Sequence, residues 1–488
     1  MKLIVGRDKE QAVLDRAYNS REAELIAVYG RRRVGKTYLV KNFSRSKPCV
    51  FFHATGVRGG KLTEQLQQFT KIIGDTFYSG ASINAPKTWL EVYEELTKAI
   101  VALPKSKKVI LFFDELPWMA TKRSRLIQSL DYFWNRYWVD FPNLKLVICG
   151  SSASWMIKKI IKHKGGLHNR ITRKILLKPF NLYETKKLLE MYKIKFNNEQ
   201  ILQIYMVLGG IPYYLKSLKK GWSAAQNINH MCFNSNGILF DEFNDIFAAL
   251  FDDAEAYKEL IALICSTKSG ISRKDIERMN KLTGKGGNLT RRLEDLEVAG
   301  FIASFIPLEH KRKGIYYRIN DEYCYFYLSW IMPAKRTLIK EENNKQYWQM
   351  KINTPKYKVW AGYAFENVCY KHISNIRRVL NVGYDAEVGS WRYIPEKENK
   401  KAGAQIDLLF NRSDGAVTLC EIKHTDKPFL IDKSYYHSLL NKAKVYKRET
   451  RTKKEIFFAL VSASGIKPSV YSEELIGDIV VLGDLFKE

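Results

Sequence analysis

The segment from Gly30 to Thr37 has the residue types and the spacing that bind phosphate. It reads Gly-Arg-Arg-Arg-Val-Gly-Lys-Thr, so two glycines precede a lysine and a hydroxyl residue. Glycines let backbone N–H groups turn toward a phosphate, the Lys36 amine reaches the terminal phosphates, and the Thr37 hydroxyl can hold Mg²⁺. The segment predicts an ATP site whose binding residues are Gly30, Arg31, Arg32, Arg33, Val34, Gly35, Lys36 and Thr37.

The elements around this segment must present it at one edge of a sheet. Glu24 to Tyr29 form a short, mostly apolar strand before it, and a helix that begins near Lys36 adds its positive end. A second apolar strand, Val109 to Phe113, leads to Asp114 and Glu115. Parallel strands bind ligands at their carboxyl ends, so we expect Asp114 to hold Mg²⁺ and Glu115 to polarise the attacking water.

Three further side chains could act on the terminal phosphate. Ser151 follows a third apolar strand and could sense this phosphate, although Gly-Ser-Ser is also ordinary turn chemistry. Arg170 and Arg173 could neutralise charge during phosphoryl transfer, from the same chain or from a neighbouring subunit of a homo-oligomer, or could be surface arginines. They belong to a stretch, 151–180, with eight basic residues and no acid, which is either a solvated face or a phosphate-binding surface.

Length and composition indicate a soluble, basic protein of several domains. The 488 residues are 46% hydrophobic, which excludes a fibrous or wholly disordered chain. Lysine and arginine number 80 against 51 acids, a net charge of +29, so we expect a polyanionic partner, namely nucleic acid and in the first place DNA. Seven scattered cysteines favour neither disulfides nor zinc. Because the chain has no signal peptide and no long apolar run, we expect a cytoplasmic protein without membrane association.

Several short motifs in the first 250 residues resemble a known family. Besides the phosphate segment they are 6–10, 113–118, 148–155, 177–180 and 208–212. Together they are similar to prokaryotic AAA-type ATPases of the STAND-related archaeal group. The resemblance implies an α/β fold with a parallel sheet, helices on both faces and a helical lid. It also implies that Arg7 and Pro212 lie near the base and sugar of the nucleotide.

The next stretch, 250–332, is patterned like a winged helix. Three helical segments are followed by two strand-like runs, Phe301 to Pro307 and Gly314 to Ile319, which are joined by the basic segment Glu309 to Lys313. Leu289, Leu293 and Leu296 share one face of the third helix. Such a module can place its third helix in DNA or serve as an internal scaffold. Its net charge is near zero, which leaves both readings open.

The C-terminal part has residues suited to phosphodiester hydrolysis. Asp407 lies on one strand of a predicted hairpin, and Glu421 and Lys423 lie on one face of the other strand. The two carboxylates could hold Mg²⁺ while the lysine orients or deprotonates water. Glu366, on an earlier helix, offers another acid. This set resembles the PD-(D/E)XK nuclease superfamily, which implies a restriction-endonuclease-like α/β domain that either cuts nucleic acid or only binds it.

These parts predict four domains: an ATPase core over 1–175, a helical lid over 176–248, the winged helix over 250–332 and the nuclease-like domain over 345–488. The segment Glu341 to Lys345 is the expected linker. The leading hypothesis is an ATPase that acts on or near DNA. The alternatives are an ATP-driven regulatory switch with a silent C-terminal domain and a toxin or defence module of a mobile element.

Overall fold

The computed structural model describes residues 4–84, 86–162, 166–267, 270–279, 286–308, 314–340, 346–393, 395 and 403–488. The chain forms two compact units. The first contains Met1–Pro179 and Ile211–Tyr213, and the second contains Phe180–Gly210 and Tyr214–Glu488. Among the described residues, no helix is both long enough and apolar enough to span a membrane.

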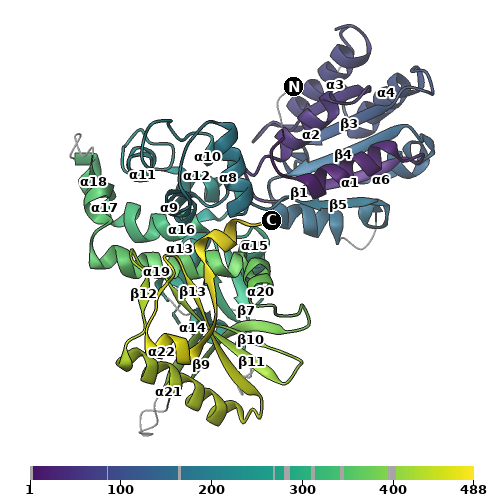
Figure 1. Ribbon diagram of the computed structural model, residues 1–488. Coiled ribbons are helices and arrows are strands. Elements are labelled where there is room, and N and C mark those ends of the chain that lie inside the picture. Colours follow the sequence, from purple (N-terminus) through teal and green to yellow (C-terminus); the bar gives the residue numbers. More distant parts are fainter. Residues whose placement is uncertain are drawn as a thin grey trace. The chain divides into compact units, whose positions relative to one another are not determined.

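The first unit is built on a five-stranded sheet with the order β2-β3-β4-β1-β5 (Figure 1). All its strand pairs are parallel, as the sequence predicted. The strands at its centre are buried almost throughout, which explains why they read as continuous apolar runs rather than as an alternating pattern. The strands are β1 (Glu24–Tyr29), β2 (Val50–Thr55), β3 (Val109–Asp114), β4 (Leu144–Gly150) and β5 (Arg173–Leu176).

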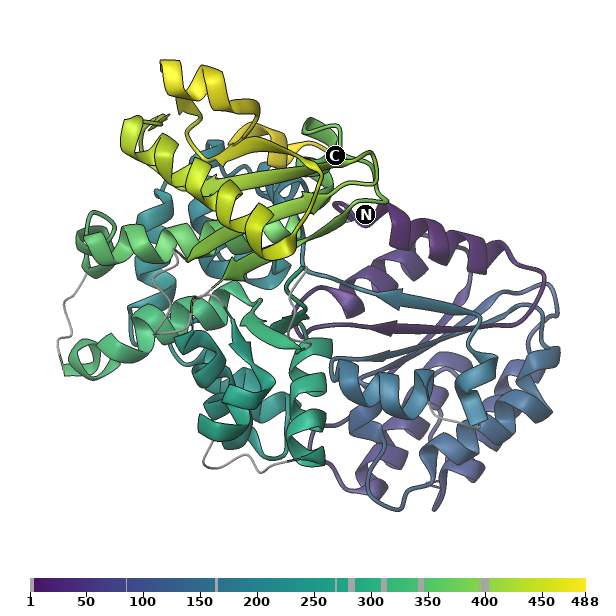
Figure 2. The ribbon, with the colours of Figure 1, turned by 90° about the horizontal axis from the view of Figure 1, so that it is seen from below.

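Helices cover both faces of this sheet, which confirms the expected layer arrangement (Figure 2). Apolar side chains alternate between the faces: Leu25 packs into the core with α3, α4 and α6, whereas Ile26 meets the side chains of α1 and α2. The helices of the unit are α1 (Asp8–Asn19), α2 (Lys36–Arg45), α3 (Leu62–Phe77), α4 (Trp89–Val101), α5 (Leu116–Met119), α6 (Leu126–Arg136) and α7 (Ala153–Met156), with short turns η1 (Trp138–Asp140), η2 (Ile157–Ile161) and η3 (Gly166–Arg170).

The second unit begins with the helices of the predicted lid. Asn181 caps α8 through a hydrogen bond from the Glu184 N–H, and the Glu184 carboxylate returns the bond to the Asn181 N–H, which fixes where the helix starts. The backbone N–H of Phe180 donates to the Gly210 carbonyl, 2.7 Å away, and so closes the segment that contains α8 and α9. The helices are α8 (Leu182–Met191), α9 (Asn198–Leu208), α10 (Pro212–Leu215), α11 (Ala224–Cys232) and α12 (Glu242–Leu250).

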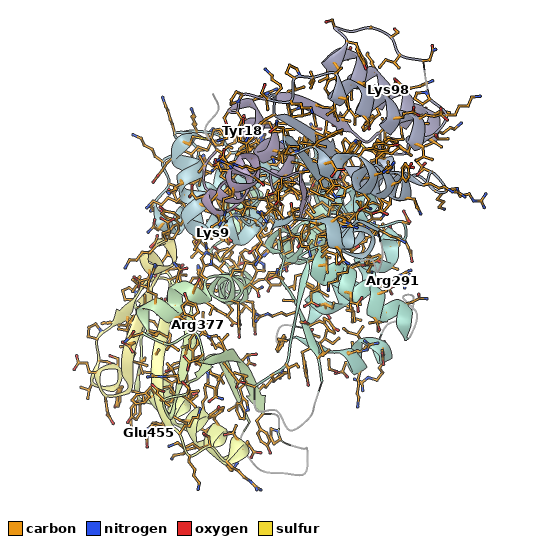
Figure 3. All side chains as sticks on the ribbon, turned by 90° about the vertical axis from the view of Figure 1, so that its right-hand side faces the viewer. Lys9, Tyr18, Lys98, Arg291, Arg377 and Glu455 are labelled. Carbon is orange, nitrogen blue, oxygen red and sulfur yellow. The ribbon has the colours of Figure 1, made fainter. Side chains whose placement is uncertain are left out.

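A middle module, residues 254–319, follows. Leu289, Leu293 and Leu296 are buried on one face of α15, as predicted, while the same helix carries the exposed Arg291 (Figure 3). The predicted basic segment 309–313 lies outside the described residues. The elements are α13 (Ala254–Ser266), α14 (Arg273–Met279), α15 (Gly287–Val298) and an antiparallel sheet in the order β6 (Ile271–Ser272), β8 (Tyr316–Ile319) and β7 (Ile302–Phe305).

Polar contacts join the connecting helices to the first lid helix and to one another. The backbone N–H of Leu182 donates to His372 Nε2 at 3.0 Å, and the Lys371 amine pairs with Glu322 Oε1 at 2.5 Å. Burial lowers the pKa of His372 to about 4, so the ring is neutral and can accept that bond. The predicted linker 341–345 is outside the described residues. The helices are α16 (Glu322–Phe326), η4 (Tyr327–Ile331), α17 (Met332–Lys340), α18 (Tyr347–Lys351), α19 (Pro355–Lys371) and α20 (Ile373–Val379).

The C-terminal sheet has the order β15-β13-β11-β10-β9. Strands β9, β10 and β11 are antiparallel neighbours, and β11, β13 and β15 run parallel. Helix α21 packs on this sheet through Leu439, Val445 and Tyr446, and Trp391 belongs to the same core. The elements are β9 (Glu387–Tyr393), β10 (Ala404–Asn411), β11 (Ala416–Lys423), β12 (Phe429–Leu430), α21 (Lys433–Thr450), β13 (Glu455–Ser462), β14 (Ile466–Lys467), α22 (Val470–Leu475), β15 (Ile476–Val481) and η5 (Leu482–Phe486).

Candidate functional site

The phosphate loop, Gly30–Thr37, connects β1 to α2 at the carboxyl end of the sheet. Gly30 has φ +140°, and a Cβ there would come within 2.3 Å of the Leu177 carbonyl oxygen. Gly35 caps α2 with φ +96°, in the left-handed region that glycine adopts at little cost. Both glycines are therefore required by the backbone path of the loop, one by close approach and one by conformation.

Two side chains of the loop form hydrogen bonds that close the loop on itself and join it to β3. The Lys36 amine, which is only 6% exposed with its side chain, donates to the carbonyls of Gly30 at 2.9 Å and Arg31 at 2.8 Å. The Thr37 hydroxyl donates to Asp114 Oδ2 at 2.8 Å. The loop and the tip of β3 are thus joined, and a hydroxyl and a carboxylate, the hard oxygen ligands that Mg²⁺ prefers, lie side by side.

Asp114 is kept ionised by its neighbours. Burial alone would raise its pKa, but hydrogen bonds from His53 and Thr37 outweigh burial and leave the pKa below its usual value. His53 lies on β2, with Nε2 at 3.5 Å from Asp114 Oδ2. The sequence analysis did not identify this residue, because only the pairing of β2 with β3 brings it to Asp114. The arrangement supplies a negative carboxylate at the point where a cation is expected.

Glu115 is oriented by the residue that was expected to sense phosphate. Its Oε2 accepts from both the backbone N–H and the hydroxyl of Ser151, each at 2.9 Å. Glu115 also has a left-handed backbone with φ +50°, which is uncommon for a residue with a side chain. The structure therefore brings Glu115 and Ser151 together at adjacent strand tips.

Arg7 and Pro212 both lie near the phosphate loop. The buried Arg7 guanidinium donates to the Val34 carbonyl at 3.2 Å. Arg33, which has φ +70°, stacks over the ring of Tyr213 with its Cζ at 4.3 Å from the centroid, and Tyr213 directly follows Pro212. Thus Arg7, which precedes the loop in the sequence, and Tyr213, which follows it by about 180 residues, both contact the loop. Of the other two loop arginines, Arg31 is buried and Arg32 is partly buried.

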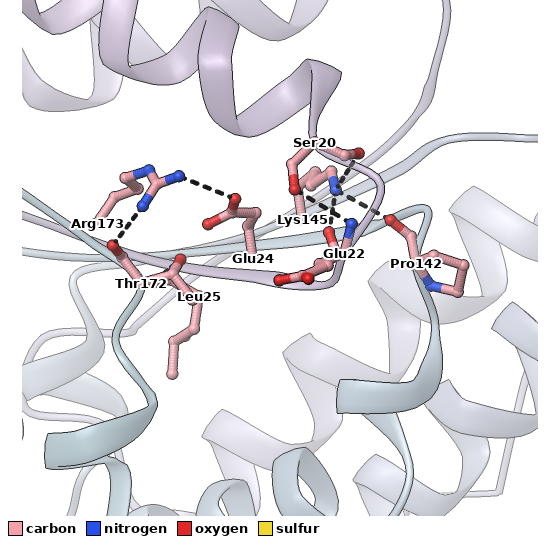
Figure 4. Close-up of polar contacts among 8 residues, drawn as sticks. All are labelled: Ser20, Glu22, Glu24, Leu25, Pro142, Lys145, Thr172 and Arg173. Atoms are coloured by element: carbon pink, nitrogen blue, oxygen red, sulfur yellow. Dashed lines mark hydrogen bonds and ion pairs between the residues drawn. The ribbon is translucent and has the colours of Figure 1, made fainter.

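Arg173 is not brought to this loop within the chain. It begins β5, opposite Ile26 of β1, and its guanidinium contacts Glu24 Oε1 at 3.4 Å (Figure 4). Glu24 begins β1, so both residues lie at the amino edge of the parallel sheet, whereas the phosphate loop follows its carboxyl edge. Arg170 is exposed at the end of η3, just before this amino edge. The two predicted arginines are therefore remote from the phosphate loop of the same chain.

Residues 4–218 match a family described as an ATPase domain predominantly from Archaea. The match indicates an ATPase domain of this archaeal type in the N-terminal part of the chain. Over 449 residues, 91% of this chain and 92% of the other, the sequence is 25% identical to the uncharacterized protein MJECL04 of Methanocaldococcus jannaschii. A 45-residue stretch, 9% of this chain, is 49% identical to the uncharacterized ATP-binding protein MJ0423 of the same organism and covers 76% of it.

Two solved structures are also similar to this chain. The Walker-type ATPase PABY2304 of Pyrococcus abyssi has a TM-score of 0.46 at 20% identity, over 67% of this chain and 96% of that one. The ORC2 protein of Aeropyrum pernix, in complexes with ADPNP and ADP, has a TM-score of 0.41 at 15% identity, over 68% and 95%.

Outside the ATPase domain, four predicted residues form what we call the acid site: Glu366 of α19, Asp407 of β10, and Glu421 and Lys423 of β11. Lys423 Nζ lies 2.9 Å from Glu421 Oε1, so the two side chains share one face of β11. Asp407 Oδ2, on the adjacent strand β10, accepts from the Ile422 N–H at 3.3 Å. The hairpin thus places two carboxylates and one amine around the same stretch of backbone.

Helix α21 adds two side chains that sequence reasoning did not assign to the acid site. Lys442 Nζ donates to Glu421 Oε2 at 2.7 Å, and the Tyr435 hydroxyl donates to Glu421 Oε1. The distance of seven residues between Lys442 and Tyr435 is two helical turns, which was the available signal that both project from one face.

The three carboxyl groups differ in charge. Burial raises the pKa of Glu421, but Lys423 and Lys442 outweigh burial and the net pKa lies below its usual value. Burial, then the charge of Glu421, raises the pKa of Asp407 to about 6. Burial, then the charge of Asp407, raises the pKa of Glu366 to about 8. Within the described ranges, no three His, Cys, Asp or Glu residues are arranged to hold a metal, so a metal there would rest on two carboxylates.

Proposed function

We propose that this protein hydrolyses ATP at the phosphate loop with Mg²⁺. The contact between Thr37 and Asp114 supports a cation site there, because it joins a hydroxyl to an ionised carboxylate. Bound Mg²⁺ would neutralise phosphate charge. Lys36 would exchange its two loop carbonyls for phosphate oxygens. Glu115 would orient the attacking water, and Ser151, which now holds that carboxylate, would contact the terminal phosphate.

We also propose that ATP hydrolysis serves an activity on DNA, and that the acid site cleaves phosphodiesters in a Mg²⁺-dependent reaction. The observation that carries this proposal is the Glu421–Lys423 pair at 2.9 Å beside Asp407 on the neighbouring strand. Asp407 and Glu421 would hold the metal, which would supply Lewis acidity. Lys423 would then orient or deprotonate the water. The basic composition of the chain supports a polyanionic substrate.

Arg170 and Arg173 would act in a homo-oligomer. Both lie toward the amino edge of the sheet, away from the phosphate loop of their own chain. An arginine from a neighbouring subunit could approach the terminal phosphate and stabilise its charge during transfer. Assembly would therefore complete the ATP site.

The experiment that tests the nuclease proposal compares three full-length proteins: wild type, the double variant Asp407→Ala, Glu421→Ala, and Lys36→Ala. Each is incubated with Mg²⁺ and mixed single-stranded and duplex DNA, with and without ATP. We expect the double variant to lose cleavage and keep ATP turnover, and Lys36→Ala to lose ATP turnover. Cleavage that survives in the double variant would place the nuclease activity elsewhere, in a contaminant or in another site.

A second candidate is an ATP-driven regulatory switch with a silent C-terminal domain. The observation that favours it is the engagement of Glu421 by Lys423, Lys442 and Tyr435, since these donors compete with a metal for the carboxylate. In this case no DNA would be cleaved under any metal condition, and ATP would change the assembly state. Light scattering with and without ATP, beside the cleavage measurement, distinguishes the two functions.

A further inference from the structure

One arginine of the middle module reaches the acid site. Arg318 lies on β8, paired with Ala303 of β7. The flanking Tyr317 and Ile319 are buried, so the side chain of Arg318 projects from the opposite face of the strand. Its Cζ lies 3.4 Å from the centroid of the Tyr370 ring. The middle module and the C-terminal domain therefore meet through this stack.

Tyr370 connects Arg318 to the acids. It follows Glu366 by four residues on α19, which places both side chains on one face of the helix. The Tyr370 hydroxyl donates to the backbone carbonyl of Asp407. Arg318 also acts on Glu366 directly: burial raises the pKa of this carboxyl, and the positive charge of Arg318 opposes the rise. Arg318 thus lies at the border of the acid site, on a different element from Lys423 and Lys442.

The contact between the two parts is held by backbone as well as by side chains. The Leu308 N–H, three residues beyond β7, donates to the Ser390 carbonyl of β9 at 3.3 Å. A Cβ on Gly389 would come within 3.0 Å of the Leu308 side chain, so the two segments of backbone pack closely. This attachment fixes the strand that bears Arg318 against the C-terminal sheet.

The contacts of the Arg318 guanidinium are suited to phosphate binding. Within the part of the chain that the structure describes, Arg318 forms no ion pair with a carboxylate; its guanidinium instead lies over the rings of Tyr370 and Phe305. Stacking on an aromatic ring fixes the plane of a guanidinium and leaves its N–H edges directed outward, where they can bind phosphate oxygens in pairs. Partial burial of a charged guanidinium costs desolvation free energy. A bound phosphate beside the acid site would offset this cost.

We propose that Arg318 binds a phosphate of the DNA strand that enters the acid site, so that this site is shared between the middle module and the C-terminal domain. The inference rests on the proposed action on nucleic acid. In this proposal the β7–β8 hairpin contributes to DNA binding at the acid site and does not enter a groove of DNA. A C-terminal domain without residue 318 would then lack part of its binding surface.

The test measures DNA affinity of the full chain in Mg²⁺ at several salt concentrations, for wild type, Arg318→Ala, Arg318→Lys and the control Arg278→Ala. Arg278 is an exposed arginine of the same module, 77% accessible and paired with Asp275, so its removal changes the net charge equally. We expect Arg318→Ala to weaken binding about 10-fold and to make the log–log salt slope shallower by about 1. The lysine variant should recover part of the affinity, and Arg278→Ala should match wild type.

Calorimetric titration of Mg²⁺ provides a second readout, because loss of a positive charge near the carboxylates should leave Mg²⁺ affinity unchanged or higher. If wild type binds DNA but Arg318→Ala and Arg278→Ala behave alike, only the Arg318 assignment is refuted. If both Arg318 variants lose DNA affinity, Mg²⁺ affinity and thermal stability together, the residue serves packing and the assignment is also refuted. If wild type binds no DNA, the proposed function itself fails.

Discussion

Glu366 should make the second compact unit less stable in alkaline solution. Its pKa is about 8 in the folded chain, against 4.5 for an ordinary glutamate, because burial and Asp407 disfavour the charged form. Between these two values the folded chain keeps a proton that the unfolded chain has released. Stability therefore falls as pH rises from about 4.5 to about 8 and is constant above that range. Glu366→Gln stays neutral throughout and should lack this decline.

The size of the effect follows from the same values. A difference of about 3.5 pH units, at about 1.36 kcal/mol each, sets an upper limit of about 5 kcal/mol. Because the side chain is only partly buried, solvent screening reduces this to about 2–3 kcal/mol. Each kcal/mol shifts the unfolding midpoint of a domain of 150–250 residues by about 2–4 °C, and that of this larger unit by about 2 °C. At pH 9 the variant should therefore unfold several degrees above wild type, and at pH 4 at the same temperature.

Differential scanning calorimetry of the full chain in EDTA measures this difference. Glu473→Gln is the control, since it makes the same chemical change at an exposed position of the same unit. The reasoning is refuted if Glu366→Gln and Glu473→Gln shift the midpoint equally at pH 9, or if Glu366→Gln stabilises the unit by the same amount at both pH values.

Three more outcomes follow from contacts described above. Lys36→Ala should remove ATP binding in calorimetry while the thermal midpoint changes little, because the amine contacts only loop carbonyls among the described atoms. His372→Gln should reduce the loss of stability on acidification from about pH 6.5 to about 4, since the wild-type ring stays neutral when folded while the unfolded ring takes up a proton; melts across this range would detect it. Gly210→Ala would place a Cβ 1.8 Å from the Phe180 carbonyl oxygen and should lower stability by about 1–3 kcal/mol or more, measured by denaturant unfolding; a neutral result would contradict the backbone path.

The ATP site was predictable because its signals are local. The phosphate loop has fixed spacing, and an apolar run that ends in Asp114 identifies a central strand. By contrast, the bond between Glu115 and Ser151 joins residues far apart in sequence. Periodicity reports which face of an element is buried, not which two elements meet. The same limit applied to His53, whose position on β2 had no meaning until β2 was paired with β3.

The acid site was predictable only in its hairpin. Side-chain alternation along β11 fixes Glu421 and Lys423 on one face, and the turn sets the pairing with β10. Lys442 and Arg318 come from a helix and from another sheet, and the packing of those elements is a tertiary property. Basic residues close together on a helix such as α21 are typical of a solvated face, because charge alone does not show which lysine turns inward.

Two contacts of α19 limit how the helices around it can move. They are the buried hydrogen bond between Leu182 and His372 and the ion pair of Lys371 with Glu322. Separating α8 from α19 would leave the Leu182 N–H without a partner, and separating α16 from α19 would do the same to the Glu322 carboxylate. Each unpaired group would cost about 1–3 kcal/mol of stability. Displacement of these helices as one body avoids that penalty. A signal that moves α8 would therefore also move α19, because the two are joined by a buried hydrogen bond. The carboxyl of Glu366, which lies on α19, would move with them.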